Sequence, residues 1–168
     1  MKITSQVVRA LLLLSTFGLC SISVAETDVW HELFHAMRFA DINRAQLESD
    51  CREDSRFTSI AHLKKLCEKR KVIPDTVMEE AALPYLKRHV SERVAKEAIA
   101  QLTEDSARTI SNKLIVEISS GRKNQLTQSD MVQLKLRNES EYGRALSAFA
   151  SDKEQGLALA RALIAYEP

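Results

Sequence analysis

Apolar residues recur along the chain at intervals of three and four, the pattern of helices with one buried face. The segment 92–102 shows this pattern most clearly, because one side of a helix there would carry Val94, Ala95, Ala98, Ile99 and Leu102. The nearest approach to an alternating β-branched run, at 114–118, lies inside a helical pattern. The sequence therefore predicts an all-α protein.

Residues that cap helices mark where most of these segments begin. Pro84 either kinks the helix that follows Pro74 or begins a new one. Gly121 is a natural stop for a helix over about 106–118. Together these features predict a compact bundle of seven or eight short helices, with starts at Asp28 (running to about Ala40), Thr58 or Ser59, the capping box Thr76–Glu79, Ser91, Thr127, Ser140 and the capping box Ser151–Glu154.

A polar segment over 122–128 separates two stretches that match weakly at an offset of 36 residues. The matched pairs are Val90-Ser91 with Leu126-Thr127, Ala107-Arg108 with Gly143-Arg144, and Ile110-Ser111 with Leu146-Ser147. Each stretch would be a capped helix, a break and a second helix. This offset predicts a degenerate duplicated helical hairpin.

The stretch Ser140-Glu141-Tyr142-Gly143-Arg144 resembles a repeat in a family of secreted helical proteins of unknown function. That family has an F-Y-x-S-P-x-G stretch between two helices. Ser140 and Gly143 match its serine and glycine, whereas Glu141 replaces its proline and Leu136-Arg137 replace its aromatic pair. The resemblance implies a helix capped by Ser140 and a close helix approach at Gly143, and it implies no catalytic residues.

The first 25 residues have the three parts of a secretory signal peptide. Lys2 and Arg9 precede an apolar core over 10–19, and Ser23-Val24-Ala25 offers small residues for cleavage before Glu26. The apolar stretch is shorter than the roughly 20 residues of a membrane anchor. Lipidation at Cys20 is a further alternative. We therefore expect a periplasmic or secreted protein with one helical domain over 26–168 and no membrane span after cleavage.

Cleavage would leave two cysteines, Cys51 and Cys67. In an oxidising compartment such a pair forms a disulfide, which would close a loop of about 17 residues. Two free thiols, or a mixed zinc site with His31 and His35, are the alternatives.

Loss of Lys2 and Arg9 would also leave 22 basic and 23 acidic residues. This charge balance argues against nucleic acid as a partner.

His31-Glu32-Leu33-Phe34-His35 matches the H-E-x-x-H motif of zinc peptidases. Residues four apart share a helix face, so both imidazoles can bind one zinc ion while Glu32 serves as general base. Glu48 or Glu53 would be the third ligand. Against this reading, no sheet is predicted, the glycine and third histidine of the extended motif are missing, and the histidines lie away from the apolar stripe of their helix.

The hypothesis with the most support is a non-enzymatic helical module that binds another protein or assists the cell envelope. An inhibitor or immunity protein has the same size and architecture. The alternative is a small zinc-dependent hydrolase that uses His31, Glu32 and His35. A pH-sensing role for the histidine pair is a third possibility.

Overall fold

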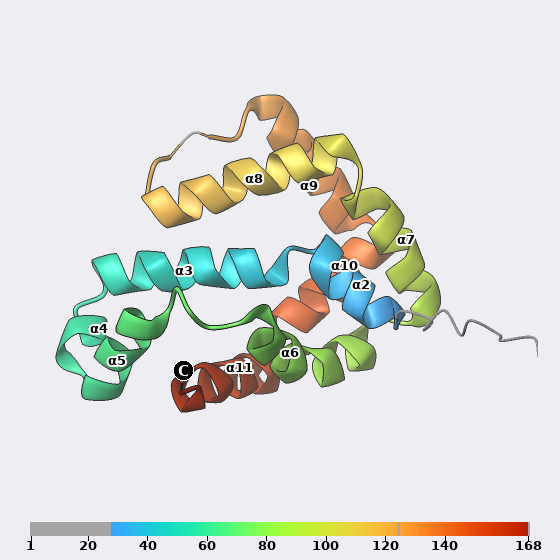
Figure 1. Cartoon of the computed structure of the whole chain (residues 1–168). Helices are drawn as coiled ribbons and strands as arrows, with labels where there is room; N and C mark the ends of the chain where they lie inside the picture. The colour runs from blue at the N-terminus through green and yellow to red at the C-terminus, as the bar shows by residue number, and fades with distance from the viewer. Residues whose placement is uncertain (1–27, 124, 168) are drawn as a thin grey trace, which may run out of the picture.

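The structure, a computed structural model, describes residues 28–123 and 125–167, and this part of the chain is helical with no strand (Figure 1). The all-α prediction is therefore confirmed. The predicted signal peptide over 1–25 lies outside the described residues. The described helices are α2 (Val29–Ala36), α3 (Phe39–Glu53), α4 (Arg56–Ser59), α5 (Ala61–Lys69), α6 (Asp75–His89), α7 (Glu92–Leu102), α8 (Asp105–Ser120), α9 (Gln128–Glu139), α10 (Glu141–Ala150) and α11 (Lys153–Ala165).

The described helices number ten, more than the predicted seven or eight, chiefly because α3 and the one-turn α4 were not predicted. The helix that Asp28 precedes ends at Ala36 rather than near Ala40. Arg38 then adopts the left-handed conformation, with φ 54°, and α3 begins at Phe39. No side chain caps α3, so its start carries none of the residues from which a helix start is predicted.

Side-chain caps are confirmed at four of the predicted helix starts. Asp28 accepts from the Trp30 amide, Ser91 from the Val94 amide, and Ser140 from the Gly143 amide. Thr127 forms a reciprocal capping box with Asp130. Each of these caps satisfies an amide that has no partner within its own helix.

Three other predicted caps are wrong. Ile60, rather than Thr58 or Ser59, precedes α5, and no side chain caps that helix. The helix α6 begins after Pro74 without a side-chain cap, so Thr76–Glu79 is not a capping box, and the helix continues through Pro84. At α11 the cap is Asp152, one residue beyond the predicted Ser151.

The helices assemble around α6, which packs against α2, α10 and α11, while α8 lies along α3 (Figure 1). Burying one of the larger core side chains contributes about 1.5–3 kcal/mol. None of the described helices is long and apolar enough to cross a membrane. The fully buried side chains of greatest volume are Phe34, Phe149, Leu33, Ile73, Met78, Leu86 and Val90.

Helix starts repeat at the offset of the predicted hairpin duplication. The helices α7 and α9 begin at Glu92 and Gln128, and α8 and α10 begin at Asp105 and Glu141. Both pairs of starts are 36 residues apart. The matched pairs Val90-Ser91 and Leu126-Thr127 thus lie just before corresponding helices.

Cys51 and Cys67 form a disulfide with a Cα–Cα distance of 5.8 Å. It joins α3 to α5.

Gly143 lies at a tight corner, where a Cβ would be 1.9 Å from the Arg137 carbonyl oxygen. The predicted close approach at this glycine is confirmed, and it is made by the backbone at the end of α9.

Candidate functional site

The helix α2, which carries the H-E-x-x-H residues, is fixed to the corner between α6 and α7. Its Trp30 indole nitrogen donates to the Val90 carbonyl oxygen at 3.1 Å. Lys87 donates to Asp28 at 2.6 Å and lies over the Trp30 ring, 5.0 Å from its centroid. The bond from Lys87 holds the pKa of Asp28 below its ordinary value. The position of the motif is therefore set by contacts distant in sequence.

Both histidines of the motif contact the carboxylate of Glu79 on α6. Nδ1 of His31 lies 2.8 Å from Oε1 of Glu79, and Nε2 of His35 lies 3.5 Å from the same oxygen. The Glu79 side chain is only 10% exposed, whereas those of His31 and His35 are 44% and 60% exposed. The imidazoles are thus partly solvated, and their inner edges meet a buried carboxylate that the sequence assigned to a capping box.

The structure does not assemble the predicted metal ligands around the histidines. Among the described residues, no group of three or more His, Cys, Asp or Glu side chains is placed to hold a metal ion. Glu53 pairs instead with Arg52 at 2.6 Å, and Glu48 lies beside the disulfide. The sulfurs of Cys51 and Cys67 are bonded to each other, so they offer no thiolate to the mixed zinc site.

A cleft of about 460 Å³ opens beside the motif, between α2 and α8, and is called here the α2–α8 cleft. Glu32 and His35 form part of its α2 wall, while Arg108 and Asn112 form its α8 wall. Glu32 therefore faces this cleft rather than the Glu79 contact. The full lining is Glu32, His35, Ala36, Arg38, Leu102, Thr103, Arg108 and Asn112.

Arg38 spans the two walls of the α2–α8 cleft at the joint between α2 and α3. Its guanidinium donates to Asp41 at 2.9 Å and to the side-chain oxygen of Asn112 on α8. A left-handed backbone is uncommon for a residue other than glycine and costs on the order of 1 kcal/mol. The contacts of the Arg38 side chain with Asp41 of α3 and Asn112 of α8 offset this cost and tie the joint between α2 and α3 to α8.

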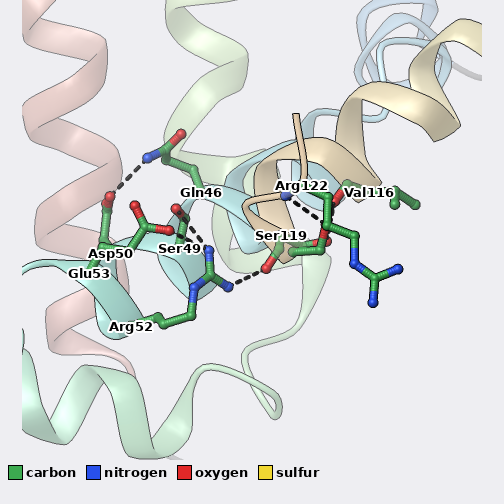
Figure 2. Close-up of polar contacts among 9 residues, drawn as sticks. Gln46, Ser49, Asp50, Arg52, Glu53, Val116, Ser119 and Arg122 are labelled. Atoms are coloured by element: carbon green, nitrogen blue, oxygen red, sulfur yellow. Dashed lines mark hydrogen bonds and ion pairs between the residues drawn. The ribbon is translucent and has the colours of Figure 1, made fainter. Parts of the chain in front are cut away.

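A second cleft of about 460 Å³ lies over the disulfide, where α3 meets the end of α8. Figure 2 shows Arg52 of α3 reaching this end, where it donates to the Ser119 carbonyl oxygen. Arg52 also donates to Ser49 of its own helix at 3.4 Å. Arg70 also lines the cleft, and its Nε atom is buried without a partner in the described part of the chain. The bond from Arg52 joins α3 to α8, whereas the hydroxyls of Ser119 and Ser120 bond within α8 to the Val116 carbonyl oxygen.

The helix α9 presents its apolar side chains outward. Met131, Val132 and Leu136 are 51%, 51% and 63% exposed, and these three residues are called here the α9 outer face. The one buried residue of α9 is Asp130, which accepts from Lys113 of α8 at 2.7 Å. This bond, with those from Thr127, lowers the pKa of Asp130 to about 2. Nothing in the sequence around Thr127 indicates that these apolar side chains face solvent.

No protein family, curated protein or solved structure matches this chain. The resemblance around Ser140 and Gly143 therefore remains a prediction. Local geometry at these two residues agrees with the resemblance, because Ser140 caps α10 and Gly143 fits a close backbone approach.

Proposed function

We propose that this chain is an exported, non-enzymatic helical protein that binds another protein through the α9 outer face. The observation that carries the proposal is the exposure of Met131, Val132 and Leu136, each more than half accessible on one side of one helix. Exposed apolar clusters on a folded protein mark interaction surfaces. A helix that offers apolar residues four apart, as Val132 and Leu136 are, fits a groove on a partner.

The α9 outer face is held in place by polar contacts on the opposite side of the helix. Lys113 bonds Asp130, and Arg137 donates to Ser106 at 3.1 Å, so α9 is joined to α8 at two points. The capping box at Thr127 fixes its first turn. Because α9 is anchored in this way, its apolar side chains remain available, and little ordering entropy opposes binding.

Export is supported by two features of different kinds. The first 25 residues have the pattern of a signal peptide, and the disulfide between Cys51 and Cys67 is typical of proteins in oxidising compartments. The near-neutral charge balance favours a protein partner over nucleic acid.

The hydrolase alternative requires Glu32 beside a zinc ion held by His31 and His35. In the structure the carboxylate against both imidazoles belongs to Glu79, and Glu32 lines the α2–α8 cleft. No observation in the described chain favours hydrolysis over binding.

The test introduces Leu136→Ser and Met131→Ser together and compares partner recovery after crosslinking in the producing cells. A matched control is Leu157→Ser, which removes a side chain of similar exposure, 57%, from α11. We expect the α9 double variant to lose the crosslinked partner while the Leu157 variant retains it. Equal recovery from both variants, with circular dichroism unchanged, would overturn the proposal.

A further inference from the structure

Two opposite charges line the α2–α8 cleft and do not pair with each other. Glu32 lies on α2 and Arg108 on α8, and both line the cleft. Neither side chain forms a hydrogen bond or an ion pair with any residue in the described ranges. They are therefore not in direct contact, and each is available to a ligand.

The other polar groups of the cleft are already engaged. Arg38 is bound to Asp41 and Asn112, and the hydroxyl of Thr103 donates to the Ile99 carbonyl oxygen at 2.8 Å. His35 is within ion-pair distance of Glu79. The cleft thus offers a ligand one free carboxylate and one free guanidinium.

This combination selects for a ligand that carries both charges. A phosphate would be attracted by Arg108 but repelled by Glu32. A metal cation would be attracted by Glu32 but repelled by Arg108. An α-amino acid offers a partner to each group, because an ammonium pairs with a carboxylate such as that of Glu32 and a carboxylate accepts two hydrogen bonds from the planar fork of an arginine such as Arg108. Ala36 and Leu102 add an apolar part to the same lining.

We infer that the α2–α8 cleft binds a free α-amino acid with an apolar side chain. Its volume of about 460 Å³ falls in the range of small-molecule sites. The cleft is separate from the α9 outer face, so this inference does not depend on the proposed protein partner. Failure of either proposal leaves the other intact.

The experiment follows the amide resonances of the full mature chain by NMR during titration with L-leucine. Two analogues each remove one charge: L-leucinamide lacks the carboxylate, and N-acetyl-L-leucine lacks the ammonium. We expect L-leucine to shift resonances around Glu32, Arg38 and Arg108, and each analogue to bind at least ~10-fold more weakly. A dipeptide, Leu-Leu, tests whether more widely separated ends are accepted, and tighter binding of the dipeptide than of L-leucine would overturn the assignment to a free amino acid.

Matched variants separate the site from general charge effects. Glu32→Gln and Arg108→Gln each remove one of the two free charges and should weaken L-leucine binding at least ~10-fold. Glu80→Gln and Arg161→Gln remove exposed charges outside the cleft lining and should leave binding unchanged. Equal affinity for leucine and both analogues, unchanged binding in the cleft variants, or no resonance shifts at millimolar leucine would overturn the inference.

Discussion

Oε1 of Glu79 lies 2.8 Å from Nδ1 of His31, and this contact joins α6 to α2 across 48 residues of sequence. The same oxygen lies 3.5 Å from Nε2 of His35, so one buried carboxylate serves both histidines of the H-E-x-x-H motif. Burying a carboxylate is costly unless it is hydrogen-bonded. The histidines therefore act as its polar partners at the surface of the bundle.

Replacing Glu79 by alanine should destabilise the fold, because it removes one of the polar contacts between α2 and α6 and leaves unfilled space. We expect the free energy of unfolding in urea to fall by about 1–3 kcal/mol. Glu80→Ala is the control, since Glu80 is exposed on the same helix, and it should change stability by less than ~0.5 kcal/mol. Equal losses in the two variants would show that the Glu79 contact contributes nothing.

Metal analysis of the purified chain tests the hydrolase alternative directly. Because Glu79 already bonds the imidazoles, we expect substoichiometric zinc, with no difference between the native chain and the His31→Ala, His35→Ala double variant. One zinc per chain, lost in the double variant, would contradict this expectation. Loss of any hydrolytic activity in Glu32→Gln would then assign the role of general base.

The bond between Lys113 and Asp130 should make the attachment of α9 sensitive to acid. The pKa of Asp130 in the folded protein is about 2, below its ordinary value of 3.8. A lowered folded pKa means that the stabilisation is complete above the ordinary value and is lost as the pH falls toward the folded value. We expect the stability difference between the native chain and Asp130→Asn to be constant above about pH 5 and to shrink between about pH 4 and 2. A difference that is independent of pH in urea unfolding would contradict this assignment.

Two glycines inside helices should respond to alanine in opposite directions. A Cβ at Gly143 would lie 1.9 Å from the Arg137 carbonyl oxygen, so Gly143→Ala should destabilise the protein by at least about 1–3 kcal/mol. A Cβ at Gly156 would meet nothing within 4 Å, so Gly156→Ala should stabilise α11 by about 0.5–1 kcal/mol. Thermal unfolding of the two variants checks both signs, and a stable Gly143→Ala variant would show that the corner can open.

The sequence predicted features that depend on neighbouring residues and missed features that depend on distant ones. Ser91, Thr127 and Ser140 were identified because a cap bonds an amide only three residues away. The start of α3 was missed because Arg38 adopts a left-handed backbone that no local pattern signals. Glu79 was assigned to a capping box, since nothing near it in sequence indicates its contact with His31.

Among the candidate binding groups, too, some can be predicted from neighbouring residues and others depend on distant ones. The motif residues His31, Glu32 and His35 were evident from their spacing, but Arg108 was not, because its role depends on the packing of α8 against the cleft. The outward direction of α9 likewise depends on Lys113, 17 residues before Asp130. Long-range packing, rather than helix propensity, decides which polar and apolar groups are left free.

The disulfide has a consequence for proteolysis of this chain. The bond between Cys51 and Cys67 encloses α4 and the first part of α5, and exposed trypsin sites lie in both helices, at Arg56 and Lys64. A single cut there leaves one covalently continuous molecule, which would migrate as the intact mass until a reductant separates the two fragments. Cleavage in this segment would therefore escape detection on an electrophoresis gel run without reduction.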